Sequence, residues 1–386
     1  MLVVSEIFPP RHGGSGRLLY ELYRRLPPAN VVAAAGLHEQ AEDFDRFSGI
    51  RTERIPLHLD RWGVLGLGSF AQYWRLAARL RDLSRMYQCR ELHVARCLPE
   101  GFAAWLLRIT YGVPYVVYVH GEETRTSASS RELSWMTRRV YGGARYLIAN
   151  SRNTAYVLQQ EWGISRSRIR ILYPGVDGGR FVPTGPSAQV RAELGWGGRR
   201  VVLTVGRLQL RKGHDMLLRA LPRVLQTVPD AHYAVVGDGA ERNRLQQLAR
   251  ELGVHDNVSF HGEISDTQMI ACYQQCDVFA LPNREVNGDF EGFGMVLLEA
   301  QACGRPVITG ASGGTQETID IGRTGLIGDC STPDFLVDAL SALLLDEPRR
   351  AAMGQAGRQW VLQQFDWRSL VKQAAEMFDI EMQEGR

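Results

Sequence analysis

Several features that define whole classes of protein are missing from this sequence. Its 386 residues contain only six cysteines, with no CxxC pair and no spacing typical of a metal site. Cys272 and Cys276 lie one helical turn apart, which buried small residues explain better than a zinc pair. There is no long apolar run and no charged leader before the first predicted strand, at residues 2–5. We therefore expect reduced thiols, a cytosolic protein, and neither a signal peptide nor a transmembrane helix.

The charge balance and the missing motifs exclude further classes. The formal net charge is only +3 at pH 7, which argues against nucleic acid as the main partner. No Walker lysine loop or HExxH occurs, which disfavours P-loop kinases and zinc proteases. The length favours two domains, and 40 glycines with 45% hydrophobic residues are typical of a globular α/β protein.

The most informative stretch that is present is EGFGMVLLE, residues 291–299. Its residues are good helix formers from Met295 onward, Gly304 is a suitable C-cap, and PVIT then predicts a strand. Glu291 should therefore precede a helix, and Glu299 should lie inside it. The glycines between them would let an anion approach the helix amides, and the inner carboxylate would suit a ribose diol. Taken singly, each glutamate is explained as well by an N-cap or a surface position.

A second glycine-rich turn lies near the start of the chain. The predicted strand at residues 2–5 runs into FPPRHGGSG, and a helix is predicted from about Arg17 to Leu26. The amides and the helix dipole of such a unit converge on a phosphate around Gly14, although this is not the GxGxxG of a dinucleotide fold. A tight turn that merely needs glycine explains the same residues equally well.

Two other predicted strands are followed by residues that suit a ligand. The run YVVYV at 115–119 is typical of a buried parallel strand, and His120 follows it at the carboxyl end, where open α/β sheets bind ligands. A second α/β segment begins with a strand at 200–205, and Arg207 and Lys212 lie on the loop after it. A guanidinium and an ammonium together suit a diphosphate, although a solvated basic loop is an equal alternative.

The ordered set of motifs resembles glycosyltransferase family 4, the retaining sugar-nucleotide transferases of the GT-B architecture. The resemblance covers nearly the whole chain and includes HGGSG, YVVYVHGEE, LTVGRLQLRKGHD, AVVGDGAERNRL, VSFHGEI, DVFALPN, EGFGMVLLE and GRPVITGASGGTQETI. Within the family, the chain is similar to heterocyst-envelope and exopolysaccharide glucosyltransferases, which build bacterial cell-surface polysaccharides. The resemblance implies an α/β fold of two Rossmann-like domains that face a cleft.

The resemblance also implies how the chain is divided. Residues 1–181 would bind the acceptor, residues 182–362 would bind the sugar nucleotide, and residues 363–386 would form a helical segment that crosses back to the first domain. The linker is expected in a region rich in Gly, Pro and Ser, at about Val182 to Ala188.

Roles for individual residues follow from the resemblance. Glu291 would hold hydroxyls of the donor sugar, Glu299 the ribose, and His120 the sugar or a phosphate. Because the motifs contain no metal-binding DxD, protein cations and loop amides would stabilise the departing diphosphate without a metal cofactor. The residues expected to be catalytic are His120, Arg207, Lys212 and Glu291. The residues expected to bind the donor are Gly14, Arg207, Lys212, His261, Glu291, Phe293, Gly294, Met295, Val296 and Glu299.

The reaction implied is transfer of a hexose to a hydroxyl of a saccharide or lipid-linked saccharide in polysaccharide biosynthesis. UDP-glucose is the expected donor, and GDP-mannose is the alternative because DFEGFGMV also resembles mannosyltransferases. A transferase with a soluble small-molecule acceptor is a second alternative. A non-catalytic sugar-nucleotide-binding protein is disfavoured, since both glutamates and both cations are retained.

One segment of the first half suggests contact with a membrane. Its apolar residues, separated by glycines, are Trp62, Val64, Leu65, Leu67 and Phe70. A predicted helix rich in arginine follows, from Gln72 to Arg85, and the combination suits an anionic membrane at its cytoplasmic face. A loop that packs under the domain, beside solvated arginines, is an equal alternative.

Overall fold

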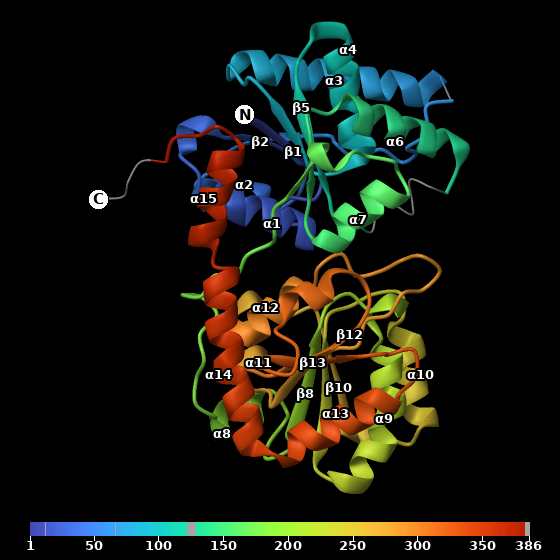
Figure 1. The fold of residues 1–386 in the computed structure, drawn as a ribbon, viewed down its shortest axis with the longest axis vertical. Coiled ribbons are helices and arrows are strands. Elements are labelled where there is room, and N and C mark those ends of the chain that lie inside the picture. The colour runs from blue at the N-terminus through green and yellow to red at the C-terminus, as the bar shows by residue number, and fades with distance from the viewer. Residues whose placement is uncertain (12, 66, 122–128, 383–386) are drawn as a thin grey trace. The chain divides into compact units, whose positions relative to one another are not determined.

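Figure 1 shows the fold of the computed structural model, which describes residues 1–11, 13–65, 67–121 and 129–382. The chain forms two compact units. The first is Met1–Pro174 together with Trp367–Arg386, and the second is Gly175–Asp366.

The two units divide at different residues from those that the sequence suggested, which were 181 and 362. The start of the second unit is tied to its end, because the amide of Val176 donates to the carbonyl of Phe365 at 2.8 Å. The stretch 182–188, expected to be the linker, therefore lies within the second unit.

The first unit contains a seven-stranded sheet with the order β3-β2-β1-β4-β5-β6-β7. Its strands are β1 (Leu2–Ser5), β2 (Val32–Gly36), β3 (Arg51–Ile55), β4 (Leu92–Val94), β5 (Tyr115–Val119), β6 (Leu147–Ala149) and β7 (Ile169–Ile171). Neighbouring strands pair in parallel. The central strands are buried along their whole length, which explains why runs such as YVVYV are apolar throughout.

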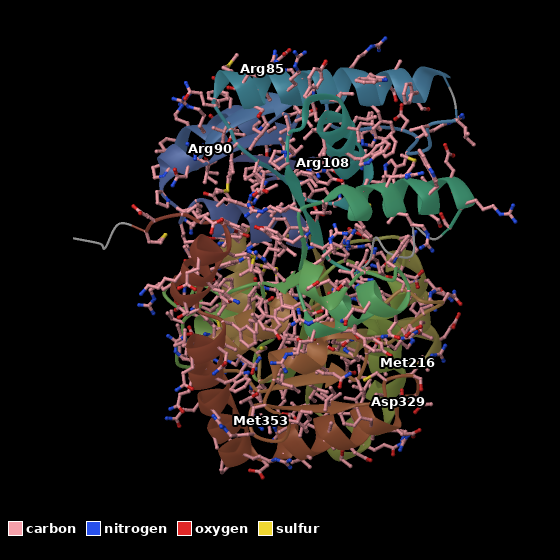
Figure 2. All side chains as sticks on the ribbon, turned by 45° about the horizontal axis from the view of Figure 1, so that its top comes forward. Arg85, Arg90, Arg108, Met216, Asp329 and Met353 are labelled. Carbon is pink, nitrogen blue, oxygen red and sulfur yellow. The ribbon has the colours of Figure 1, made fainter. Side chains whose placement is uncertain are left out.

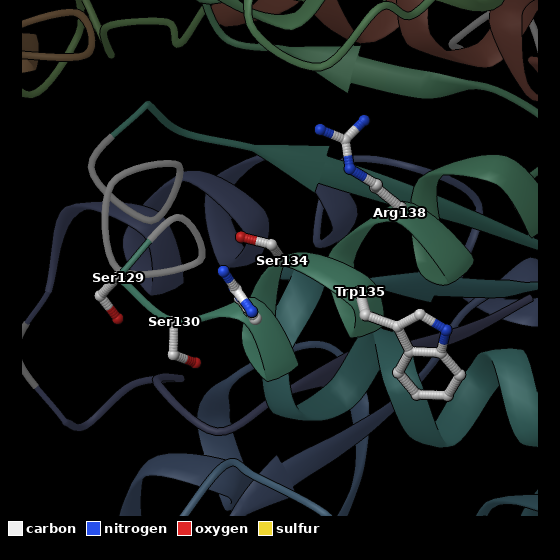
Figure 3. A pocket seen from close by; sticks show the side chains of 6 residues that line it. Ser129, Ser130, Ser134, Trp135 and Arg138 are labelled. Carbon is white, nitrogen blue, oxygen red and sulfur yellow. The ribbon is translucent and has the colours of Figure 1, made fainter.

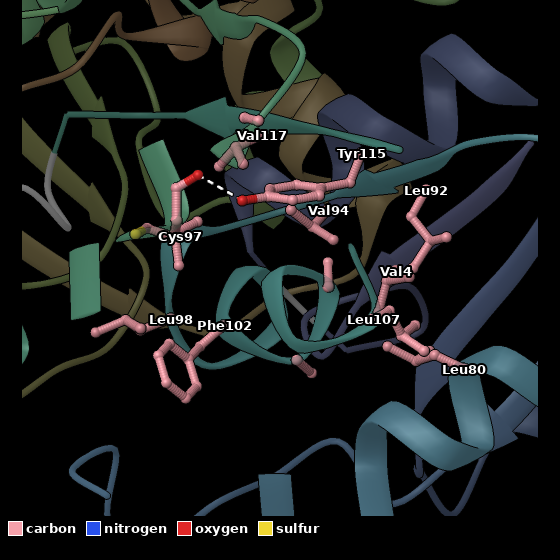
Figure 4. Close-up of a cluster of buried hydrophobic side chains, with 14 of the residues drawn as sticks. Val4, Leu80, Leu92, Val94, Cys97, Leu98, Phe102, Leu107, Tyr115 and Val117 are labelled. Atoms are coloured by element: carbon pink, nitrogen blue, oxygen red, sulfur yellow. Dashed lines mark hydrogen bonds between the residues drawn. The ribbon is translucent and has the colours of Figure 1, made fainter. Parts of the chain in front are cut away.

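Helices cover this sheet. They are α1 (Gly14–Tyr23), α2 (Ala41–Phe47), α3 (Leu67–Met86), α4 (Phe102–Tyr111), α6 (Arg131–Gly143), α7 (Arg152–Gln160) and α15 (Trp367–Met377). Figure 4 shows part of the core, in which the buried Tyr115 donates from its hydroxyl to the carbonyl of Val140 at 2.6 Å. Burial of this tyrosine therefore leaves its hydroxyl with a partner.

The helix after the first glycine-rich turn begins earlier than the sequence suggested. α1 starts at Gly14 rather than near Arg17, so Gly14 is a helix residue. A Cβ at Gly16 would lie 2.1 Å from the carbonyl oxygen of Ile7, so only glycine fits where this helix passes the end of β1. His12 of the same motif lies outside the described residues.

The C-terminal helix packs on the first unit. α15 lies against α1, and beyond it Phe378 stacks on Tyr23 with ring centroids 6.0 Å apart. The carbonyl of Met377, at the end of α15, accepts hydrogen bonds from the Tyr146 hydroxyl at 3.2 Å and from Arg170 at 2.8 Å. The expected return of the C-terminal segment to the first domain is confirmed.

The second unit contains a six-stranded sheet with the order β10-β9-β8-β11-β12-β13. Its strands, which also pair in parallel, are β8 (Arg200–Val205), β9 (Ala231–Val236), β10 (Val258–Gly262), β11 (Val278–Leu281), β12 (Val307–Gly310) and β13 (Gly325–Gly328). Its helices are α8 (Ala188–Glu193), α9 (His214–Thr227), α10 (Arg242–Glu251), α11 (Asp266–Gln275), α12 (Met295–Ala302), α13 (Asp334–Leu345) and α14 (Glu347–Gln364). The predicted pair of Rossmann-like domains is confirmed. No helix among the described residues has the length and apolar character that crossing a membrane requires.

Candidate active site

One part of the candidate active site is the loop that follows β8. A short 3-10 turn, Leu210–Lys212, leads through Gly213 into α9. Gly213 has a φ of 78°, and a Cβ there would lie 1.8 Å from the carbonyl oxygen of Pro282. This close approach demands glycine and holds the backbone next to Lys212, which is itself buried.

The side chains of this loop meet Glu291. The ammonium nitrogen of Lys212 lies 2.6 Å from Oε2 of Glu291, and Nη1 of Arg211 bonds to the same oxygen. Nε of Arg211 lies 3.3 Å from Oδ2 of Asp289. Burial raises the pKa of Glu291, but the Lys212 and Arg211 cations outweigh burial and hold this pKa below its ordinary value. Glu291 is therefore a buried carboxylate that is ionised at neutral pH.

Asp289 is presented by a tight hairpin between β11 and α12. Val286 and Asp289 exchange two backbone hydrogen bonds of 3.0 Å across the residues Asn287 and Gly288. Both turn residues have positive φ angles, 52° and 79°, as a two-residue hairpin turn of this hand requires.

A second glycine turn holds the backbone of Glu291. The amide of Gly314 donates to the carbonyl of Glu291 at 2.9 Å. A Cβ on Gly313, which has a φ of 70°, would lie 2.0 Å from the same carbonyl oxygen. Gly313 and Gly314 of the motif GASGGTQ therefore position Glu291, which is a reason for these two residues that the sequence alone does not reveal.

α12 begins at Met295, shortly after Glu291, as predicted. Its N-cap is Gly294, with a φ of 91°, and its first residues, Met295 and Val296, are half-buried. Phe293 is buried against Phe365, with ring centroids 5.8 Å apart. The first amides of a helix have no acceptor within the helix and attract anions.

Glu299 lies in the second turn of α12, as predicted, and has different surroundings. It is buried, and the hydroxyl of Tyr273 on α11 donates to its Oε2 at 2.8 Å. Glu291 contacts two cations, and Glu299 accepts a hydrogen bond from the hydroxyl of Tyr273.

Two other predicted residues of the second unit lie in different places on its sheet: Arg207 follows the carboxyl end of β8, and His261 lies in the outermost strand, β10. Arg207 is exposed on the loop that carries Lys212. His261 lies on β10, where its Nε2 is 3.3 Å from Nε1 of Trp196 and 3.0 Å from the hydroxyl of Ser259. Burial lowers the pKa of His261, so this ring is neutral at pH 7.

Gly14 and His120 belong to the first unit. Gly14 is exposed at the first position of α1. His120 is buried after β5, and its Nε2 lies 3.0 Å from the carbonyl oxygen of Ala95. Asn150, which follows β6, donates to the carbonyl of His120 at 3.0 Å. His120 therefore lies at the carboxyl edge of the sheet, where the sequence placed it.

A pocket of about 470 Å³ opens at the start of α6 in the first unit (Figure 3). Its lining residues are Ser129, Ser130, Arg131, Ser134, Trp135 and Arg138. None of the predicted site residues lies in this pocket, so it is not part of the candidate active site.

Sequence reasoning missed three neighbours of the predicted residues. Arg211 and Asp289 adjoin Glu291, and Tyr273 adjoins Glu299. The adjacent cations in the motif RKG could have indicated Arg211. Nothing local indicates the other two, because their partners lie elsewhere in the chain. Among the described residues, no group of three or more His, Cys, Asp or Glu could hold a metal ion.

Comparison with known proteins bears on both units. Residues 12–180 match the model "Glycosyltransferase Family 4", and residues 187–360 match "Glycosyl transferases group 1". A GDP-mannose-dependent alpha-(1-6)-phosphatidylinositol monomannoside mannosyltransferase of Mycolicibacterium smegmatis is 34% identical over 98% of this chain and 97% of its own length. A GDP-mannose-dependent monoacylated alpha-(1-6)-phosphatidylinositol monomannoside mannosyltransferase of Corynebacterium glutamicum is 33% identical over 95% of this chain and 94% of its own.

Solved structures share the fold at lower identity. HepE of Anabaena, in complex with UDP-glucose, has a TM-score of 0.82 at 21% identity and covers 98% of this chain and 99% of its own. Sucrose-phosphate synthase of Thermosynechococcus elongatus has a TM-score of 0.79 at 22% identity, with 98% of both chains covered. With these matches, two parallel-sheet units and the motifs in order, the chain belongs to glycosyltransferase family 4 and transfers a sugar from a nucleotide sugar.

Proposed function

We propose that this enzyme transfers a hexose, with retention of anomeric configuration, from a nucleoside diphosphate sugar to a hydroxyl of a lipid-linked saccharide. The observation that carries the proposal is the cluster of Arg211, Lys212 and Glu291 beside the N-terminus of α12. Cations next to the first turn of a helix suit a diphosphate, and an ionised carboxylate beside them suits the hydroxyls of the donor sugar.

We assign each predicted residue a role from the chemistry of its side chain. Lys212 and Arg207 would neutralise the charge that develops on the departing diphosphate, with the amide at Gly294 as a further donor. Glu299 would accept hydrogen bonds from the ribose. Because two protein cations fill the place of a metal, the proposed reaction needs none.

GDP-mannose is the donor that we propose, in place of the UDP-glucose expected from the sequence. The relatives at 33–34% identity, which match nearly the whole chain, are named as GDP-mannose-dependent. HepE, the neighbour bound to UDP-glucose, is only 21% identical. UDP-glucose is therefore the second candidate.

The relatives' names also favour a lipid acceptor, since both act on a phosphatidylinositol mannoside. The segment proposed for membrane contact needs correction, because Trp62 and Val64 pack against the first core. Of the residues that the sequence suggested, Leu65 and Phe70 are exposed, and Trp74 on α3 is a further exposed apolar side chain. The side chain of Leu67 lies outside the described residues.

Exposed arginines lie on α3 and on the helices packed beside it. The exposed ones on α3, α4 and α6, which pack in that order, are Arg75, Arg79, Arg85, Arg108, Arg131, Arg138 and Arg139; Arg85 and Arg108 are labelled in Figure 2. Exposed aromatic residues and exposed arginines on neighbouring helices suit a peripheral site on an anionic, cytoplasmic membrane face.

The deciding experiment is a donor panel. Purified protein would be incubated with GDP-mannose, UDP-glucose, GDP-glucose or UDP-galactose and a membrane extract that contains phosphatidylinositol mannosides, and the products analysed by mass spectrometry and NMR. We expect transfer from GDP-mannose and an α-linked product. Transfer from UDP-glucose alone would reverse the donor assignment, a β-linkage would exclude retention, and transfer only to soluble acceptors would exclude the lipid.

A further inference from the structure

Arg211 is placed unusually for an arginine. Its side chain is 4% exposed. Among the residues that the structure describes, Arg211 and Lys212 are the only buried arginine and lysine. A buried cation is costly unless several partners compensate it, so its contacts deserve a reason.

Those contacts tie one loop to another. The guanidinium reaches Glu291 with Nη1 and Asp289 with Nε, the second at 3.3 Å. The carbonyl of Arg211 accepts from the amide of Arg284 at 2.9 Å. Glu291, Asp289 and Arg284 all lie on the segment between β11 and α12, so Arg211 holds that segment at three points. A planar guanidinium spans two carboxylates, whereas a lysine presents a single point charge.

Lys212 shares only the carboxylate of Glu291, through one contact of 2.6 Å. Its ammonium can serve a diphosphate only by leaving Glu291 or by sharing it. If Lys212 were the only cation there, Glu291 would then be a buried carboxylate without a charged partner. Arg211 keeps Glu291 paired with a cation, because the contact between its Nε and Asp289 holds the guanidinium in place.

We propose that Arg211 is a positioning residue, which keeps Glu291 anchored and ionised for the donor sugar while Lys212 binds the diphosphate of the donor. This rests on the proposed function. In this role Arg211 does not touch the donor, so its loss should lower kcat through Glu291 and spare binding of the nucleotide. Loss of Lys212 should instead weaken binding of the nucleotide.

The test compares Arg211→Gln, Lys212→Gln and Glu291→Gln, with Arg223→Gln as the control. Arg223 pairs with Asp334 at 2.6 Å on the surface of the same unit. GDP and UDP binding would be measured by calorimetry, and turnover by release of the nucleoside diphosphate. We expect Lys212→Gln to weaken nucleoside diphosphate binding at least about tenfold, and Arg211→Gln to change it less than about threefold while lowering kcat about a hundredfold. The Arg211→Gln/Glu291→Gln double variant should be no slower than Glu291→Gln alone, because the two residues act as one unit.

Two results would overturn the proposal: loss of nucleotide binding in Arg211→Gln equal to that in Lys212→Gln, or multiplied losses of kcat in the double variant. Should Arg211→Gln fail to fold, Asp289→Asn is the alternative variant, because it removes the charge that holds Nε of the same guanidinium. This variant should lower kcat several-fold and leave nucleotide binding unchanged. An unchanged kcat would count against the proposal. A wild type that binds nucleotide but never turns over donor would contradict the proposed function alone. In that case the nucleotide affinities of the Arg211 and Lys212 variants would still test the role of Arg211. A wild type that binds neither GDP nor UDP would overturn both the proposed function and the role of Arg211.

Discussion

The ammonium of Lys212 lies 2.6 Å from the carboxylate of Glu291, so two residues expected to act separately on the donor are partners of each other. Their contact joins the loop after β8 to the segment before α12. In the proposed reaction Lys212 also binds the diphosphate, which makes both side chains sensitive probes of that reaction.

Replacing Lys212 by Ala should abolish transfer. A point charge that gains importance as the diphosphate departs cannot be replaced by water, and one such group is worth about 3 kcal/mol, or roughly a hundredfold in rate. Steady-state kinetics at saturating donor would measure this, with Arg223→Ala as the control. A variant that keeps more than about a tenth of the wild-type rate would contradict the assignment of Lys212.

Substitutions of the two glutamates should change different kinetic constants. Glu299→Ala should mainly raise KM for the donor, because a ribose contact is nearly the same in the ground and transition states. Glu291→Ala should mainly lower kcat, because Glu291 would act at the reacting sugar. Tyr273→Phe, which removes the hydroxyl that contacts Glu299, should cause a smaller rise in KM. Reversed effects for the two glutamates would show that their roles have been exchanged.

Turnover should survive EDTA. Lys212 and Arg207, with loop amides, would occupy the place that a metal holds in DxD enzymes. Activity would be measured after dialysis against EDTA and after addition of Mg²⁺ or Mn²⁺, with a metal-dependent transferase as the positive control. Strict dependence on either ion would contradict metal-independent transfer.

Stability should fall as the pH drops below about 6.5. Burial lowers the pKa of His214 to about 4, with the Lys212 charge adding to the effect, and burial together with Arg199 lowers that of His232 to about 4. The unfolded chain binds protons below pH 6.5 while these folded rings stay neutral until about pH 4. Each ring should therefore cost on the order of 1–2 kcal/mol of stability by pH 5.

Melting temperatures at pH 7.5 and pH 5 would measure this loss. A variant with His214→Gln and His232→Gln should lose less of its melting temperature on acidification than the wild type does. His255→Gln is the control, because His255 is exposed and should leave the difference unchanged. An equal loss in the double variant would show that other groups cause the pH dependence.

Membrane association should depend on Phe70 and Trp74, which are 41% and 37% exposed. We expect salt-sensitive sedimentation with anionic liposomes that weakens in the Phe70→Ser/Trp74→Ser variant, while hydrolysis of the donor is unaffected. Phe47→Ser removes an even more exposed aromatic residue, on α2, and should have no effect. Equal sedimentation with neutral vesicles, or no loss in the double variant, would favour a soluble acceptor.

The sequence predicted those features that depend on neighbouring residues. Strands such as Tyr115–Val119 and Arg200–Val205 have the predicted bounds, because a buried parallel strand is an unbroken apolar run. The start of α12 at Met295 followed from Gly294 and the helix formers after it. The family followed from short motifs in order, each of which is local.

Only the tertiary structure decided which side chains meet. Arg211 and Glu291 are 80 positions apart in the chain, and Tyr273 reaches Glu299 from another helix. No periodicity encodes such pairs, since they arise when strands far apart in sequence become neighbours in one sheet. The division of the chain likewise depends on the Val176–Phe365 hydrogen bond, and the exposure of Trp74 rather than Trp62 depends on what the core of the first unit covers. Local pattern fixes the elements and the chemistry available, whereas packing decides which charges are buried together.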